Sequence, residues 1–241
     1  MTFDANLIKA ICFDIDGTLS DTDDLWIQKI LPFVLPFKHI FPKMEPERLT
    51  RRLIMNLETP GNYLYYLLDR LGWDAFAGRI YMWINRSVLH PKKKRFLMVP
   101  GAKQAVITLG QHYPLAVVSS RDHAGTVNFL NTFEIHPHFR AIATSQTCYY
   151  TKPFPDPVLW AAAQLGVDPC HCLMVGDTVV DIKAGKAAGA QTVGVLCGFG
   201  EEEELRSAGA DLIIDSPLEL LSRLPFPTGQ VETQMDTGSP Q

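Results

Sequence analysis

The chain has 241 residues, of which 46% are hydrophobic and 20% are charged. This composition excludes a disordered or collagen-like chain, and the length suits one large domain or a core domain with a smaller one. Lys and Arg total 22 against 26 Asp and Glu, for a formal net charge of −4. The chain therefore lacks the basic excess that is typical of a nucleic-acid-binding protein.

The sequence carries no pattern for export or membrane insertion. No apolar run reaches the roughly 20 residues of a membrane-spanning helix, and the acidic start lacks the basic and apolar regions of a signal peptide. The five cysteines are odd in number and scattered, which indicates free thiols in a reducing compartment. We expect a cytoplasmic protein that binds neither membrane nor nucleic acid.

Short apolar runs bounded by polar turn residues predict buried parallel strands. In chain order these runs are 10–13, 115–118, 141–143, 172–175, 192–196 and 212–214. Apolar spacing near the helical period predicts helices over 101–112, 155–166 and 179–190, and Gly166 is a candidate C-cap. The alternation of strands and helices favours an α/β fold with a parallel sheet.

The stretch after the first predicted strand has a different pattern. Residues 20–98 lack strand-like alternation and predict about four amphipathic helices, interrupted by Pro and Gly. They hold 13 Lys and Arg against 8 Asp and Glu, whereas the remainder holds 9 against 18. We predict a core domain of residues 1–19 and 99–224, an inserted helical domain of residues 20–98, and a disordered tail of residues 225–241.

Two carboxylates follow the first predicted strand. Asp14 and Asp16 lie two positions apart, and Gly17 allows the chain to turn sharply. Open α/β sheets bind ligands at the carboxyl ends of their strands. Acids this close suit a shared divalent metal, or a nucleophile and a proton donor. The alternative is an acidic turn or a helix N-cap.

Hydroxyl groups and a lysine follow the next strands. Ser119 and Ser120 close the second strand, where such groups bind phosphate oxygens, although paired serines are more often helix N-caps. Lys152 lies in a loop that Pro153 and Pro155 stiffen. Near carboxylates a lysine would neutralise a phosphoryl group, whereas a lone lysine is more often a surface residue.

A second pair of carboxylates follows the fourth predicted strand. Asp177 and Asp181 are four positions apart, so the start of a helix would hold them on one face. Hard oxygen ligands of this kind suit Mg²⁺. The alternative, above all for Asp181, is a cap on the following helix. All four polar groups fall at one edge of the predicted sheet.

In this order and context the motifs resemble the haloacid dehalogenase superfamily of phosphatases. The matching pieces are CFDIDGTL, AVVSS, the Lys152 of TKPFPDP, and VGDTVVDIKAGKAAGA, and the resemblance extends to about residue 224. The later stretch AGAQTVGVLCGFGEEEELRSAGADLIIDSPLEL is similar to the phosphoglycolate phosphatase and pyrophosphatase branch. The resemblance implies a Rossmann-like parallel-sheet core with an inserted helical cap domain.

The resemblance also implies catalytic roles. Asp14 would attack phosphorus and form an aspartyl-phosphate. Asp16 would protonate the leaving oxygen and later activate water. Lys152 would link Asp14 to the phosphoryl group and offset its negative charge.

Binding roles follow from the same resemblance. Ser119, Ser120 and Thr18, together with Lys152, would bind the phosphate. The implied ligands of Mg²⁺ are Asp14, the backbone carbonyl of Asp16, Asp177 and Asp181, the last directly or through a water. The basic excess of the cap suits an anionic substrate. Arg51, Arg52 and Arg86 are candidates to contact it, the alternative being solvated helix faces.

The sequence therefore predicts a Mg²⁺-dependent phosphomonoester hydrolase, monomeric or homodimeric, acting on a small anionic phosphometabolite. The leading candidate substrate is 2-phosphoglycolate. Dehalogenases lack the second acid, so Asp16 argues for phosphoryl transfer. Inorganic pyrophosphatase stays open, as does a sugar-phosphate phosphatase or mutase, although Thr18 and the lack of an early cap histidine weigh against a mutase. From another class, a non-catalytic phosphate-responsive binding module stays open.

Overall fold

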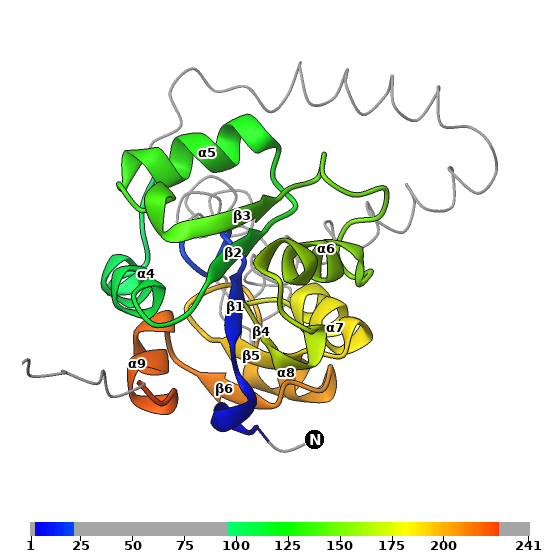
Figure 1. The fold of residues 1–241 in the computed structure, drawn as a ribbon. Helices are drawn as coiled ribbons and strands as arrows, with labels where there is room; N and C mark the ends of the chain where they lie inside the picture. Colours follow the sequence, from blue (N-terminus) through cyan, green and yellow to red (C-terminus); the bar gives the residue numbers. More distant parts are fainter. Residues whose placement is uncertain (1–2, 22–95, 227–241) are drawn as a thin grey trace, which may run out of the picture.

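The computed structural model describes residues 3–21 and 96–226 (Figure 1). The strands are β1 (Ala10–Phe13), β2 (Leu115–Val118), β3 (Phe139–Ala143), β4 (Cys172–Gly176), β5 (Gln191–Val195) and β6 (Leu212–Ile214). The α-helices are α4 (Ala102–Gly110), α5 (His123–Thr132), α6 (Asp156–Leu165), α7 (Val179–Ala188), α8 (Glu202–Ser207) and α9 (Leu220–Arg223). Single 3₁₀ turns lie at Ala5–Leu7, His136–His138, Pro169–His171 and Pro217–Glu219. In these ranges no helix has the length and apolar character needed to cross a membrane.

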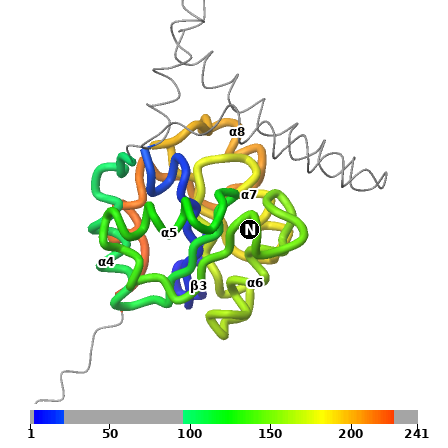
Figure 2. Tube along the Cα trace, turned by 90° about the horizontal axis from the view of Figure 1, so that it is seen from above, coloured from blue at the N-terminus to red at the C-terminus, as the bar shows by residue number. Residues whose placement is uncertain are grey.

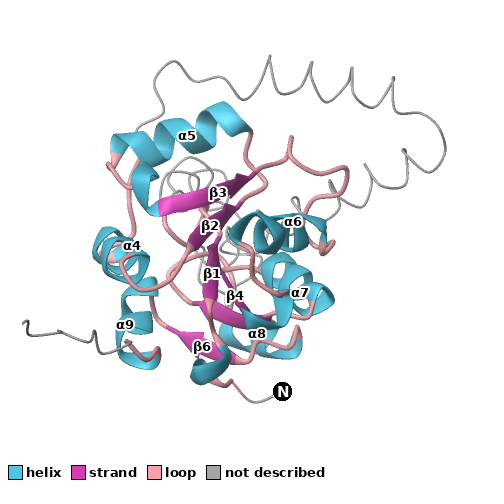
Figure 3. Ribbon diagram, viewed as in Figure 1, coloured by secondary structure: helices cyan, strands magenta, loops and turns pink. Residues whose placement is uncertain are grey.

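The strands form one parallel sheet in the order β3-β2-β1-β4-β5-β6 (Figure 3). The central strand β1 pairs with β2 and β4, so that Phe13 lies opposite Val117 on one side and Val175 on the other. Because all pairs are parallel, the carboxyl ends of the strands share one edge of the sheet. The residues that follow β1, β2 and β4 therefore lie close together in space.

Alternate residues of the strands build two different cores. Ile11 and Phe13 belong to a core of large side chains that includes Phe129 of α5. Ala10 and Cys12 belong to a core of small side chains that includes Ala161 of α6. Accordingly α4, α5 and α9 cover one face of the sheet and α6, α7 and α8 cover the other (Figures 1 and 2). Small residues let α6 and α7 approach the sheet closely.

All six predicted strands are confirmed, with ends that move by at most two residues. The three predicted helices form α4, α6 and α7, and Gly166 ends α6 at a φ of +67°. Helices α8 and α9 are missing from the prediction, and so is helix α5. Its N-cap is Asp122, which accepts a hydrogen bond from the backbone of Gly125 at 2.7 Å. The alternative that Ser119 or Ser120 caps a helix is therefore wrong.

The predicted inserted domain, residues 20–98, lies almost entirely outside the described residues, but its two ends are seen. The N–H of Asp21 donates to the carbonyl of Leu97, and the N–H of Val99 donates to the carbonyl of Leu19, each at 3.0 Å. The segment therefore leaves and rejoins the core at one place, at the carboxyl end of β1.

Most of the predicted tail, residues 225–241, also lies outside the described residues. Its first two residues contact the segment that follows α4. The carbonyl of Pro225 accepts a hydrogen bond from the hydroxyl of Tyr113, and the ring of Phe226 lies 4.9 Å from that of His112.

Candidate active site

The turn after β1 carries Asp14 and Asp16. The backbone N–H of Asp14 donates to the carbonyl of Val175 in β4 at 2.9 Å, so pairing within the sheet fixes its position. Asp14 is only 5% exposed. Gly17, with a φ of +75°, reverses the chain as the sequence predicts, because this left-handed conformation disfavours residues with a Cβ.

The ammonium group of Lys152 bridges two carboxylates. Its Nζ lies 2.8 Å from Oδ1 of Asp14 and 2.6 Å from Oδ1 of Asp181, and the residue is 3% exposed. Burial alone would lower the pKa of Lys152, but the negative charges of Asp14 and Asp181 raise it above its ordinary value. The alternative of a surface lysine is therefore wrong, and a fixed positive charge stands beside Asp14.

The positive charge of Lys152 does not hold the pKa of Asp14 at its ordinary value. Burial, together with the negative charges of Asp181 and Asp16, raises the pKa of Asp14 to about 7 against the lowering effect of Lys152. The site thus holds more negative charge than Lys152 neutralises. A bound cation would lower the pKa of Asp14 and keep it ionised.

Three buried carboxylates are arranged to hold such a cation. Oxygen atoms of Asp14, Asp177 and Asp181 lie within 4.8 Å of one another. Carboxylate oxygens are the hard ligands that Mg²⁺ prefers, with water completing its shell. The residues present therefore fit a divalent cation, and this group joins three of the four ligands that the sequence predicts.

Asp177 is held from both sides. Its Oδ1 accepts from the hydroxyl of Thr18 at 3.2 Å, and its Oδ2 accepts from the backbone N–H of Phe199 at 2.9 Å. A Cβ at Gly17 or at Gly198 would lie 2.1 Å from Oδ2. The loop after β5 was not among the predicted site residues, although its Gly-Phe-Gly sequence was a signal. The prediction that Thr18 contacts phosphate stays a prediction.

Asp181 makes the helix-capping contacts that were expected from the sequence as the alternative, and it also belongs to the carboxylate cluster, while metal binding by Asp181 stays a prediction. It is buried at the start of α7, where its Oδ2 accepts from the backbone N–H of Thr178 at 3.0 Å and from its hydroxyl at 2.7 Å. Its Oδ1 accepts from Lys152. One oxygen thus caps the helix while the other faces the carboxylate cluster.

The two predicted serines lie in different environments. Ser119, 5% exposed, follows β2 and donates its backbone N–H to the carbonyl of Ala143 at 3.0 Å. Its Oγ accepts from the backbone N–H of Arg121 at 3.2 Å. Ser120 is exposed. Because β2 neighbours β1, Ser119 lies at the same edge as Asp14, and both phosphate contacts stay predictions.

The predicted cap arginines Arg51, Arg52 and Arg86 lie outside the described residues. The described ends of their segment lie at the site itself. An isolated bridge joins Asp16 to Ser20, and another joins Ser20 to Met98. The turn that carries the carboxylates therefore contacts the returning chain directly.

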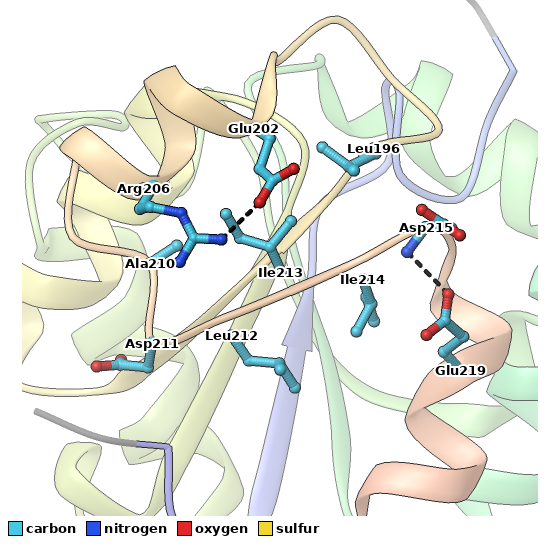
Figure 4. Close-up of a pocket in the computed structure, with 10 residues that line it drawn as sticks. All are labelled: Leu196, Glu202, Arg206, Ala210, Asp211, Leu212, Ile213, Ile214, Asp215 and Glu219. Carbon is cyan, nitrogen blue, oxygen red and sulfur yellow. Dashed lines mark hydrogen bonds and ion pairs between the residues drawn. The ribbon is translucent and has the colours of Figure 1, made fainter.

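A separate hollow of about 330 Å³ lies beside β6 (Figure 4). It shares no residue with the carboxylate cluster. Its charged groups pair with their neighbours, since Arg206 binds Glu202 and the backbone of Asp215 donates to Glu219. We therefore place the candidate active site at the carboxylates.

Comparisons with known proteins identify the family of the chain. Residues 11–195 match the family model of haloacid dehalogenase-like hydrolases. The chain is 32% identical to the phosphoglycolate phosphatase of Escherichia coli over 91% of its own length and 94% of that protein. It is 28% identical to the pyrophosphatase PpaX of Bacillus pumilus over 89% of its own length and 95% of that protein.

Solved structures show the same fold. A haloacid dehalogenase-like hydrolase of Streptococcus pneumoniae aligns with a TM-score of 0.64 at 23% identity, covering 90% of this chain and 99% of that one. The chain belongs to the haloacid dehalogenase-like hydrolase family. It is a hydrolase built on a Rossmann-like parallel sheet, as the resemblance implied.

Proposed function

We propose that this protein is a Mg²⁺-dependent phosphomonoester hydrolase that works through an aspartyl-phosphate on Asp14. The observation that carries the proposal is the buried bridge of Lys152 between Asp14 and Asp181, two members of the three-carboxylate cluster. A nucleophilic carboxylate beside a fixed cation suits attack on a negatively charged phosphoryl group.

The residues around Asp14 prepare the attack on phosphorus. The sheet fixes the backbone of Asp14, which lowers the entropy cost of reaching the attacking geometry. Lys152 neutralises charge on the incoming phosphoryl group. Ser119 donates its hydroxyl hydrogen to a phosphoryl oxygen, because its Oγ already accepts from the backbone of Arg121.

Asp16 acts as the general acid and then as the general base in this proposal. Its side chain is 36% exposed, so both the leaving group and water reach it. It gives a proton to the leaving oxygen when the aspartyl-phosphate forms, and then takes a proton from the water that hydrolyses this intermediate.

The chain holds its metal ligands in advance. Asp14, Asp177 and Asp181 would hold Mg²⁺, which would supply positive charge that offsets the repulsion between a carboxylate and a phosphate dianion. Thr18 and the backbone of Phe199 orient Asp177. Thr178 orients Asp181. The backbone carbonyl of Asp16 is the fourth ligand in this proposal.

The substrate that we propose is a small anionic phosphometabolite, with 2-phosphoglycolate first and pyrophosphate second. Relatives named "Phosphoglycolate phosphatase", at 32% identity, and "Putative pyrophosphatase PpaX", at 33% identity, support both candidate substrates equally. Residues 20–98 form the cap over the site, since both ends of this segment meet there. Arg51, Arg52 and Arg86 of the cap meet the second anionic group.

We also assign the enzyme to the cytoplasm. The five cysteines all lie in the described residues and form no disulfide bond, and thiols persist in a reducing compartment. Cys12 and Cys172 are buried in β1 and β4, where they pack as small apolar residues.

The test is hydrolysis of p-nitrophenyl phosphate with Mg²⁺. Asp14→Asn, which keeps the shape and removes the nucleophile, is expected to lower kcat by about 10³-fold or more. Asp215→Asn, at an exposed carboxylate beside the separate hollow, serves as the control and keeps full activity. A fully active Asp14→Asn variant would overturn the mechanism.

A panel of metabolites separates the alternatives. 2-Phosphoglycolate, pyrophosphate and a sugar 1-phosphate are compared by kcat/KM, with isomerisation of the sugar phosphate as the mark of a mutase. A fluoroberyllate adduct trapped on Asp14 distinguishes an enzyme from a phosphate-responsive binding module, since a module that only binds phosphate has no need of a reactive carboxylate.

A further inference from the structure

The carboxylate of Asp16 accepts two hydrogen bonds from the guanidinium group of Arg121. Nε of Arg121 donates to Oδ2 of Asp16 at 2.8 Å, and Nη2 of Arg121 donates to Oδ1. Two parallel hydrogen bonds from a planar guanidinium fix the plane of a carboxylate as well as its position. Asp16 therefore has a defined orientation although its side chain is 36% exposed.

The guanidinium group is itself held in place by aromatic rings. Its central carbon lies 5.5 Å from the ring centroid of Phe96 and 5.5 Å from that of Phe129. The two rings meet edge to face, with centroids 5.7 Å apart. Cation–π contacts of this kind attract the guanidinium to the ring faces, and the side chain of Arg121 is only 11% exposed.

The backbone of Arg121 is fixed as well. Its N–H donates to Oγ of Ser119 at 3.2 Å. Its carbonyl accepts from the N–H of Ser145 at 2.9 Å. Arg121 thus joins the loop after β2 to the loop after β3, and a rigid support of this kind is what a positioning group needs.

We propose that Arg121 is a positioning residue that orients Asp16 for hydrolysis of the aspartyl-phosphate. This inference rests on the proposed function. Each carboxylate oxygen has two lone pairs, so two hydrogen bonds from Arg121 do not by themselves use up the capacity of Asp16 to take a proton from water. The half-exposed side of Asp16 admits that water, while Arg121 holds the acceptor in place.

In this step water hydrolyses the aspartyl-phosphate. The oxygen of water bonds to phosphorus, and the bond from phosphorus to the Asp14 oxygen breaks with its electron pair returning to Asp14. The proton of water passes to Asp16. The products are inorganic phosphate, a free Asp14 carboxylate and a protonated Asp16.

Lys152 and Arg121 pair with different carboxylates, so loss of Arg121 should affect hydrolysis of the aspartyl-phosphate more than its formation. Lys152 forms ion pairs with Asp14 and Asp181 inside the carboxylate cluster. Arg121 forms an ion pair with Asp16, which lies outside this cluster. With p-nitrophenyl phosphate the leaving group departs as a stable phenolate and needs little help from an acid. Formation of the intermediate from this substrate then does not depend on Arg121, and its hydrolysis does.

The test follows the release of p-nitrophenol in a stopped-flow experiment with Mg²⁺. The fast first turnover reports formation of the aspartyl-phosphate, and the later steady rate reports its hydrolysis. Arg121→Met keeps an apolar stem between the two rings and removes the guanidinium. We expect it to lower the steady rate on the order of 10- to 100-fold and to lower KM in parallel, with the first turnover changed less than about 3-fold.

Two further variants complete the test. Arg121→Lys keeps the charge but loses the planar fork, and is expected to recover part of the steady rate. It also replaces the Met variant if that variant fails to fold. Arg206→Met makes the same substitution at an exposed ion pair with Glu202, 68% and 56% exposed, and is expected to have no effect.

The outcomes separate the two proposals. An unchanged steady rate in both Arg121 variants, or an equal fall of the first turnover and the steady rate, would overturn the role of Arg121. A wild-type protein that releases no p-nitrophenol would overturn the proposed function, and this inference with it.

Discussion

Asp14 and Asp16 lie two positions apart on one turn, and the fold surrounds them differently. Asp14 is 5% exposed and shares the ammonium group of Lys152 with Asp181. The side chain of Asp16 is 36% exposed and has the planar guanidinium of Arg121. Burial shifts the pKa of Asp14 to about 7, which marks the side of the turn where a further cation is needed.

This difference shows how one turn can serve two chemical roles. A buried carboxylate is costly to ionise, so its charge state depends on the ions around it. A half-exposed carboxylate exchanges protons with water and needs mainly a fixed direction. The positioning of the nucleophile and the handling of protons can therefore be altered separately.

The largest effect is expected from removal of the buried ammonium group of Lys152. Lys152→Met leaves Asp14 and Asp181 facing each other, so kcat is expected to fall by about 10³-fold or more. Without Mg²⁺ at pH 8, the free energy of unfolding in urea is expected to fall by about 3–5 kcal/mol. Lys103→Met, whose partner Glu134 is 83% exposed, is the control and changes stability by under about 0.5 kcal/mol. Equal losses in the two variants would contradict the comparison.

The second largest effect is expected from a substitution at Gly17 that would displace the proposed metal ligand Asp177 without removing it. A Cβ at Gly17 would lie 2.1 Å from Oδ2 of Asp177, whereas a Cβ at Gly166 meets nothing within 4 Å. Both glycines have a positive φ, +75° and +67°, so both alanine variants carry similar backbone strain of about 1 kcal/mol. Gly17→Ala is expected to lower kcat/KM by about 100-fold, and Gly166→Ala by less than about 2-fold. A similar activity in the two variants would show that the glycine contact with Asp177 is unimportant.

A smaller effect concerns pH and the metal-free protein. The pKa of Asp14 is about 7 when folded and 3.8 ordinarily, so the folded state binds a proton more tightly than the unfolded chain. Stability contributed by this proton is full below about pH 4 and is lost as the pH rises through about 7. Thermal unfolding should show Mg²⁺ raising Tm by about 5 °C more at pH 8 than at pH 5. Asp14→Asn should flatten this dependence, and an unchanged slope in that variant would assign it to other groups.

The smallest effect sharpens the role of Thr18. Thr18→Val removes the hydroxyl that donates to Asp177 at 3.2 Å, a hydrogen bond worth about 1 kcal/mol. The Mg²⁺ concentration for half-maximal activity is expected to rise by about 2- to 5-fold, while Thr18→Ser stays close to wild type. A raised substrate KM with unchanged Mg²⁺ dependence would instead place Thr18 on the phosphate.

Much of the core was predictable because its strands are buried on both faces. Continuous apolar runs such as 10–13 and 115–118 are then the natural pattern, and both runs match the observed strands. Helix α5 was missed because HAGTVNFLNT mixes polar residues with a glycine, and packing of Phe129 and Leu130 on the sheet stabilises it. Tertiary packing thus overrides a weak local signal.

The carboxylate cluster was predictable for a related reason. Parallel strands end at one edge, so acids that follow β1 and β4 had to approach each other. The ion pair between Arg121 and Asp16 was not predictable from the sequence. It depends on Phe96 and Phe129, which come from opposite sides of Arg121 in the sequence and meet only in the folded core. Nothing in the local sequence indicates which way the arginine points.

The hydrogen bond between Asp21 and Leu97 has an evolutionary consequence. It brings the two junctions of the intervening segment side by side, so a turn of a few residues would be long enough to connect them. Segments of different size and sequence can therefore be exchanged at this place without disturbing the strands or the acidic ligands. Reaction chemistry and substrate choice can then evolve at different rates within one polypeptide, and chimaeras made at these junctions offer a direct route to new substrate selectivity.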